Sequence, residues 1–156
     1  LLLLSFLSTI TLALATSSAL AQDEEPIEKN KFEKLSELYV NYNAGFAYLA
    51  ECSNFERHLT KKPFYMAGAQ VTAAALQDQL KLEFPDETIE NINKMVLNKS
   101  DEVRSKGKED ILKNGCDGTF ASAAKKHVIK FSDYHPQFIM QIIDNFDKPD
   151  VPASAE

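Results

Sequence analysis

The sequence lacks the short motifs that most often carry enzyme chemistry. It has five glycines, with no glycine-rich phosphate loop and no glycine-flanked serine of the nucleophile-elbow type. Its two cysteines lie far apart, so neither the Cys-x-x-Cys of thioredoxin-like redox sites nor the Cys-x-x-Cys-His of c-type haem attachment occurs. Glu-x-x-His, the di-iron signature of helical bundles, is also missing. We therefore expect a protein that is not an enzyme and holds no cofactor.

Histidine is scarce as well, with His58, His127 and His135 as the whole set. His127 and His135 are eight positions apart, so they do not form the i, i+4 pair on one helix face that zinc sites often use. Haem b held by His127 and a methionine is an alternative, but methionines at helical spacing usually fill a core. We expect no metal site.

Positive charge is in the minority. Lysine and arginine number 17 against 23 aspartates and glutamates, which gives a net charge of −6. A protein of this sign is repelled by phosphate backbones, and no basic stripe with interleaved aromatic residues offsets the repulsion. We expect no nucleic-acid partner.

Residues 1–21 contain no charged side chain and end in Ala19-Leu20-Ala21, before an acidic stretch. An apolar run followed by Ala-x-Ala is typical of a cleavable secretory signal. A retained membrane anchor is the alternative, because an uncharged run of this length nearly spans a bilayer. We expect cleavage before Gln22, which leaves an exported protein, periplasmic or secreted, that is not integral to the membrane.

The two cysteines, Cys52 and Cys116, both belong to the part that remains after cleavage. Exported proteins reach an oxidising compartment, where two thiols more often form a bridge than stay free. Two unrelated buried thiols are the alternative. A bridge across this separation would stabilise the fold by about 4 kcal/mol through loss of chain entropy in the unfolded state.

Apolar residues recur at intervals of three and four along most of the chain, which predicts helices. The first begins near Phe32 and continues to about Leu59, and the second spans about 61–83. Asp86 is the expected N-cap of the third helix, which ends at Asn114-Gly115, and Asp117 is the expected N-cap of the fourth. Pro136 lies inside the fourth pattern and predicts a kink or break near residues 133–135.

Four helices with short connections favour an all-α, antiparallel up-down-up-down four-helix bundle. That topology places Cys52 and Cys116 at one pole, as a disulfide requires. The expected organisation is a signal peptide at 1–21, an acidic flexible lead-in at 22–30, one helical-bundle domain at 31–148 and a disordered tail at 149–156. Asn98 matches the N-glycosylation pattern, which occurs often by chance.

Two stretches carry no charge, 38–50 and 63–77, and the second is rich in alanine and glycine. Either their small residues let the first two helices cover one another closely, or they present an apolar face to a partner. The first helix being simply central in the fold is the plainest reading. On the partner hypothesis, the binding face is formed by Tyr48, Phe55, Phe64, Tyr65 and Met66.

These features favour a non-enzymatic protein that acts through protein–protein contacts or self-association. Its expected role is that of a small accessory or structural subunit of a bacterial envelope assembly. The alternative is a periplasmic carrier of a small apolar or aromatic ligand, held in the bundle core between aromatic residues such as Tyr42 and Phe131.

Overall fold

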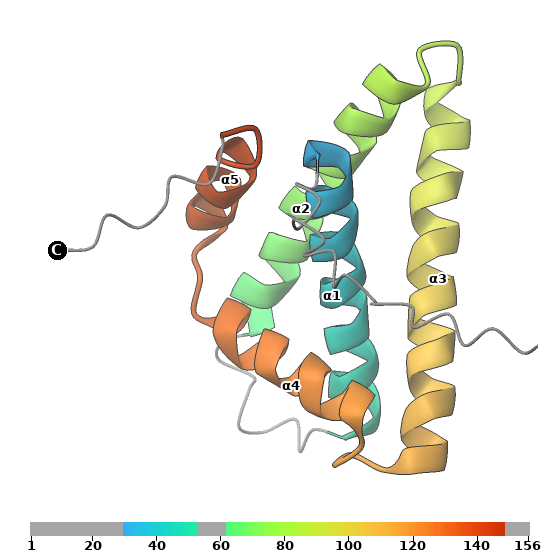
Figure 1. Ribbon diagram of the computed structural model, residues 1–156, viewed down its shortest axis with the longest axis vertical. Coiled ribbons are helices and arrows are strands. Elements are labelled where there is room, and N and C mark those ends of the chain that lie inside the picture. Colours follow the sequence, from blue (N-terminus) through green and yellow to red (C-terminus); the bar gives the residue numbers. More distant parts are fainter. Residues whose placement is uncertain (1–29, 53–61, 149–156) are drawn as a thin grey trace, which may run out of the picture.

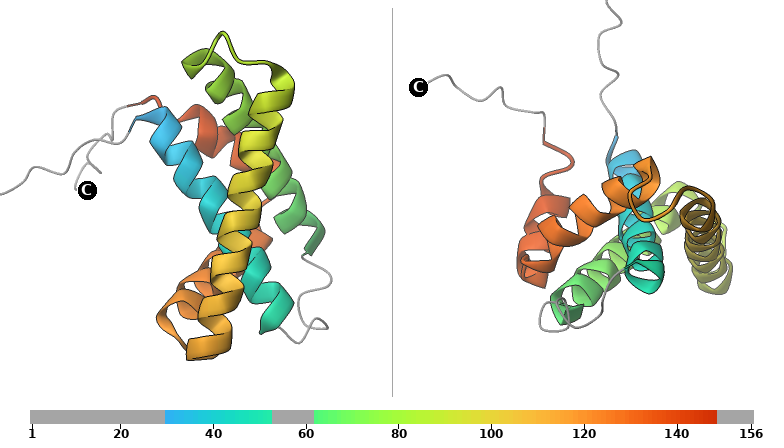
Figure 2. Two further views of the ribbon diagram at one scale, coloured as in Figure 1. Left: turned by 90° about the vertical axis from the view of Figure 1, so that its right-hand side faces the viewer. Right: turned by 90° about the horizontal axis from the view of Figure 1, so that it is seen from below.

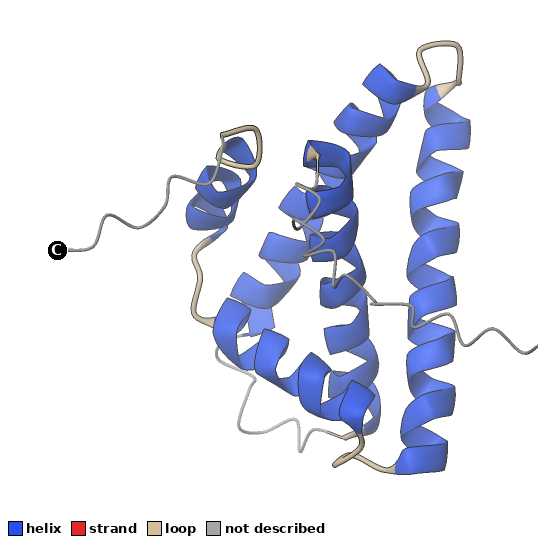
Figure 3. Ribbon diagram, in the orientation of Figure 1, coloured by secondary structure: helices blue, strands red, loops and turns tan. Residues whose placement is uncertain are grey.

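The computed structural model describes residues 30–52 and 62–148, and all of their regular structure is helical (Figure 3). The predicted signal peptide, most of the lead-in, the tail and Phe55 lie outside the described residues. The all-α prediction is confirmed. Five helices are present, α1 (Lys31–Glu51), α2 (Lys62–Glu83), α3 (Ile89–Asn114), α4 (Thr119–Ser132) and α5 (Pro136–Asp144).

The helices pack around α1. α1 and α3 run in one direction, α2 runs the opposite way, and α4 lies obliquely to these three (Figures 1 and 2). α1 contacts α2, α3 and α4, whereas α5 packs on α2. Both sides of α1 are therefore covered, which explains why residues 38–50 need no charge. Ten residues of this helix are buried, namely Leu35, Leu38, Tyr39, Tyr42, Asn43, Ala44, Gly45, Ala47, Tyr48 and Leu49.

The helix ends differ in part from the sequence predictions. α1 ends at Glu51, earlier than the apolar spacing indicated, with Cys52 as its C-cap. α3 is capped by Thr88 and not by Asp86, because the Thr88 hydroxyl is placed to accept the Asn91 N–H. The N-cap of α4 is Gly118 in place of Asp117. Spacing locates a helix well, but several polar residues near its start compete for the cap.

The predicted break near Pro136 is confirmed. α4 stops at Ser132, and His135 becomes the N-cap of α5, its Nδ1 accepting the Gln137 N–H at 3.3 Å. Proline at the first position of α5 needs no hydrogen-bond donor there and has the backbone angle of a helix already set. The predicted fourth helix is thus two helices.

The predicted disulfide is confirmed. Cys52 at the end of α1 is bonded to Cys116 in the α3–α4 connection, with the two Cα atoms 5.6 Å apart. The connection turns at Gly115, whose φ of 77° is the one positive value among the described residues. Glycine adopts that angle without steric cost, so the chain can reverse directly beside the bridge.

The interface of α1 with α2 is built from two reciprocal tyrosine–glycine contacts. The hydroxyl of Tyr65 in α2 occupies the space where a side chain on Gly45 of α1 would stand. The hydroxyl of Tyr42 in α1 does the same at Gly68 of α2. Each helix therefore carries both a large ring and the notch that receives the ring of the other. The small residues of stretches 38–50 and 63–77 thus let α1 and α2 cover one another, which is one of the two interpretations offered by the sequence.

The interface of α1 with α3 is held by polar contacts. The buried Asn43 side chain accepts hydrogen bonds from Ser100 Oγ at 2.7 Å and from Arg104 Nε at 2.9 Å, and it donates to the Tyr39 carbonyl at 2.9 Å. The Arg104 guanidinium also lies over the Phe46 ring, 4.7 Å from its centroid. A buried amide satisfied in this way fixes the relative position of two helices, because a shift would leave it unpaired.

Candidate functional site

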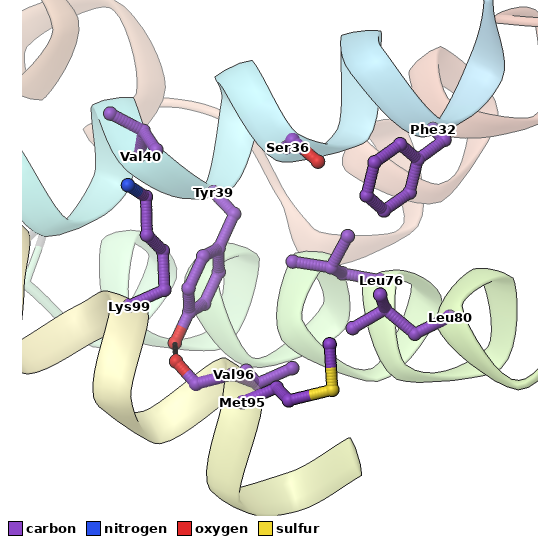
Figure 4. Close-up of a pocket in the computed structure, with 9 residues that line it drawn as sticks. All are labelled: Phe32, Ser36, Tyr39, Val40, Leu76, Leu80, Met95, Val96 and Lys99. Atoms are coloured by element: carbon purple, nitrogen blue, oxygen red, sulfur yellow. Dashed lines mark hydrogen bonds between the residues drawn. The ribbon is translucent and has the colours of Figure 1, made fainter. Parts of the chain in front are cut away.

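An apolar pocket lies where α1, α2 and α3 meet (Figure 4). Its volume is about 260 Å³. Each helix contributes residues spaced three or four apart, so one face of each helix lines the pocket. The lining consists of Phe32, Ser36, Tyr39 and Val40 from α1, Leu76 and Leu80 from α2, and Met95, Val96 and Lys99 from α3.

Few polar groups reach this α1–α2–α3 pocket. The Tyr39 hydroxyl donates to the Val96 carbonyl at 3.0 Å, so its hydrogen is already used (Figure 4). The Ser36 hydroxyl stands between the Phe32 and Tyr39 rings. Lys99 closes one end, with its ammonium 3.1 Å from a carboxylate oxygen of Glu102, an exposed ion pair. The pocket therefore offers an apolar surface with one cation at its edge.

The mouth of the pocket is apolar too. Met95 is 42% exposed and lines the pocket on the α3 side. Three more large apolar side chains are exposed around the α2–α3 connection, namely Leu82 in α2, Phe84 directly after it and Ile89 at the start of α3. Exposed apolar side chains that lie together on a folded chain often mark contact sites for other molecules. The lining suits the desolvation of an apolar group.

The partner face predicted from the sequence is only partly on the surface. Tyr65 is 0% exposed and Tyr48 is 7% exposed, so these two rings are core residues and the expectation that they face a partner is not met. Phe64 and Met66 are each 42% exposed and remain available, and Phe55 lies outside the described residues. Aromatic spacing marks the buried side and the binding side of a helix alike, which is why the sequence did not separate them.

A cluster of aromatic rings around His127 occupies the space between α1, α2 and α4. The Tyr65 hydroxyl lies 3.2 Å from the Tyr42 carbonyl and 3.0 Å from His127 Nδ1. Because a hydroxyl has one proton, donation to the carbonyl requires that Nδ1 carry the imidazole hydrogen. His127 Nε2 and the Tyr42 hydroxyl have no hydrogen-bond partner among the described residues.

The ionisation of this cluster follows from its burial. Burial lowers the pKa of His127 to about 4, and the nearby Lys130 ammonium acts in the same direction. Burial also raises the pKa of Tyr42 and of Tyr65 well above the ordinary tyrosine range. The three rings are therefore neutral at physiological pH. A raised tyrosine pKa is the opposite of what a tyrosine base needs, so the cluster is suited to packing more than to proton transfer.

The sequence missed the α1–α2–α3 pocket because the pocket depends on how three helices converge. Among residues 30–52 and 62–148, no group of three or more histidine, cysteine or acidic side chains is arranged to hold a metal ion. No helix in that part of the chain is long and apolar enough to cross a membrane. Comparison with protein-family models, with curated proteins and with solved structures gives no match.

Proposed function

We propose that this is a non-enzymatic, exported protein that binds another protein, as a small accessory or structural subunit of a bacterial envelope assembly in the periplasm or outside the cell. The observation that carries the proposal is the open, apolar α1–α2–α3 pocket with its apolar mouth. A partner inserts one apolar side chain there, with an acidic neighbour close to Lys99. Apolar anchors that fill pockets supply most of the binding energy in protein interfaces.

The size of the pocket favours a side chain over a free ligand. Small-molecule sites usually measure about 300–1,000 Å³. The pocket, at about 260 Å³, falls just below that range, and its mouth is open to solvent. A protein partner can also contact the apolar residues exposed around the α2–α3 connection, which a small ligand held in the pocket does not reach.

Formaldehyde crosslinking in cells that produce the protein natively, combined with light scattering of the purified chain, tests the proposal. We expect a discrete crosslinked product or a dimer. Met95→Glu places a charge at the pocket mouth and abolishes that product. Leu112→Glu is the matched control, because Leu112 is on the same helix, is 69% exposed and lies away from the pocket. A monomer with no crosslinked neighbour, or a product insensitive to Met95→Glu, contradicts the proposal.

The second candidate is a carrier of a small apolar ligand. It is favoured by the apolar lining together with the Lys99 ammonium, a combination that fits a short amphiphile with an acidic head group. Native mass spectrometry separates the two ideas. A carrier retains additional small-molecule mass after gentle purification, and Met95→Glu lowers that retention, whereas a protein-binding subunit shows the bare chain.

For the fold we propose the up-down-up-down plan of a four-helix bundle, with α4 and α5 together taking the place of the fourth helix. The alternating directions of α1, α2 and α3 support this plan (Figure 1). The break at His135 lets α5 pack on α2 although α4 lies obliquely to it. Straightening the break with Pro136→Ala, followed by structure determination, tests whether one continuous fourth helix forms.

A further inference from the structure

A second pocket lies between α1 and α4, separate from the α1–α2–α3 pocket. Its volume is about 390 Å³, within the usual range of small-molecule sites. Leu38 and Asn41 line it from α1, and Lys126, His127, Lys130 and Phe131 line it from α4. Its lining is more polar than that of the first pocket, so it selects a different kind of occupant.

Positive charge is concentrated on α4 against the overall sign of the protein. The helix carries Lys125, Lys126 and Lys130 and no acidic residue between Thr119 and Ser132, in a chain of net charge −6. Lys126 and Lys130 are one turn apart and both line the pocket. Like charges at this spacing destabilise a helix slightly, and an anion between them removes that cost. Among the described residues, the ion pairs involve other lysines, namely Lys31, Lys99, Lys106 and Lys108.

The same pocket has a flat aromatic wall. The His127 ring is stacked on Phe131, with ring centroids 4.2 Å apart and an interplanar angle of 22°. The contact with Tyr65 at Nδ1 fixes the orientation of that imidazole. The Lys130 ammonium lies 5.4 Å from the Phe131 centroid, so a cation and an aromatic surface occur side by side. A simple inorganic ion would leave the apolar part of this wall unused.

We propose that the α1–α4 pocket binds a small aromatic anion. Its ring packs against Leu38 and the Phe131 side of the stacked pair, and its acidic group lies between Lys126 and Lys130. The Asn41 amide, on the opposite wall, donates to the same group. This site is independent of the α1–α2–α3 pocket, so either assignment can fail without the other.

Nuclear magnetic resonance titration with benzenesulfonate tests the proposal, because this aromatic anion stays ionised throughout the useful pH range. We expect saturable shifts of the His127 and Phe131 ring signals, with a Kd of about 1–10 mM for so small a probe. Methanesulfonate has the charge without the ring and benzyl alcohol has the ring without the charge, so neither should produce saturation in that range. Absence of saturation with benzenesulfonate, or equal binding of either control compound, overturns the proposal.

Three lysine variants locate the site. Lys126→Gln and Lys130→Gln should each weaken benzenesulfonate binding about fivefold, the effect of one lost exposed charge contact. Lys125→Gln is the matched control, since it removes the same charge from the same helix outside the pocket lining, and it should leave the Kd unchanged. Equal weakening by all three variants would mean that the anion responds only to the general charge of α4, which contradicts a defined site.

The His127 pKa gives a further readout, which reports whether the anion binds next to this side chain. The Lys130 ammonium contributes to holding this pKa at about 4, and a bound anion opposes that effect. Saturation with benzenesulfonate should therefore raise the His127 pKa measured by the same method. An unchanged His127 pKa at saturation would place the anion elsewhere and overturn the assignment.

Discussion

The two sides of α1 differ in how completely they are packed. Toward α2 the helix is filled to contact around Tyr42 and Tyr65, each of which is seated against a glycine of the other helix. Toward α3 it is held by a small polar network centred on Asn43, and a pocket of about 260 Å³ remains next to it. One helix therefore carries a side that stabilises the fold and a side that leaves apolar surface accessible.

This difference indicates which side of α1 has space to bind another molecule. A core packed at the density of protein interiors tolerates neither added nor removed atoms without loss of stability. Side chains that line an open pocket lack part of the van der Waals contacts that a packed core provides. If the filled side maintains the fold and the open side binds, changes of side-chain volume must have opposite effects on the two sides.

The largest expected effect concerns the disulfide at the end of α1. Replacing both Cys52 and Cys116 by serine should lower the free energy of unfolding by about 4 kcal/mol, since the bridge closes a loop between residues 64 positions apart. Urea unfolding of the oxidised protein and of the variant measures this loss. Dithiothreitol should destabilise the parent and leave the serine variant unaffected. Equal free energies of unfolding for the two proteins would show that the disulfide does not stabilise the fold.

The aromatic cluster around His127 should also make stability depend on pH. Its folded pKa of about 4 lies below the ordinary value of 6.5, so the unfolded chain binds the proton more readily between these values. Stability from this group is complete above pH 6.5 and falls as the pH drops toward 4, by at most about 1.4 kcal/mol per pH unit.

Urea unfolding at pH 7.5, 6 and 5 measures that slope. His127→Gln removes the titrating group, and the slope of the variant should be shallower than that of the parent. The neighbouring Tyr42 and Tyr65, whose pKa values are raised by burial, stay neutral over this range and do not produce the slope. Parallel slopes in parent and variant would contradict a buried, neutral His127.

Added volume on the filled side should be costly. Gly68→Ala brings a methyl group against the Tyr42 hydroxyl, and we expect a net loss of about 1–2 kcal/mol after the better helix propensity of alanine is included. Tyr42→Phe alone should be nearly neutral, because the hydroxyl it removes has no partner among the described residues. In the Tyr42→Phe background the cost of Gly68→Ala should shrink. Strictly additive effects in this double-mutant cycle would contradict the reciprocal contact.

Added volume on the open side should have the opposite sign. Ser36→Leu extends an apolar side chain from the wall of the α1–α2–α3 pocket, and filling it should raise the free energy of unfolding by about 0.5–1 kcal/mol. Ser36→Ala is the matched control, because it changes helix propensity without filling the space. If Ser36→Leu destabilises more than Ser36→Ala, the pocket is not available to an apolar group.

Much of the fold could be predicted because it depends on local signals. Spacing of three and four residues identified the helices, and Pro136 identified the break. The expectation of export, combined with the expected helix directions, paired Cys52 with Cys116. Each of these signals lies within one segment or follows from the order of segments. The caps Thr88 and Gly118 were not predicted, because the neighbouring Asp86 and Asp117 belong to a residue type that is preferred over threonine and glycine at N-caps.

The candidate sites could not be predicted in the same way. Tyr65 was expected on a binding face and is fully buried, because its position depends on the notch at Gly45, a residue of a different helix. Met95 and Leu80 read as ordinary helix residues in the sequence, and only the convergence of α2 and α3 brings them to one pocket. Pairing between distant helices is the information that periodicity does not contain.

Photo-crosslinking from the pocket mouth tests the central claim most directly. A p-benzoylphenylalanine at position 95 samples whatever occupies the α1–α2–α3 pocket in cells that produce the protein. We predict one discrete protein adduct in the otherwise unchanged chain, and its loss when Ser36→Leu fills the pocket of a folded protein. An adduct of the same mass and yield in the Ser36→Leu background would contradict the claim that the open side of α1 is the binding side.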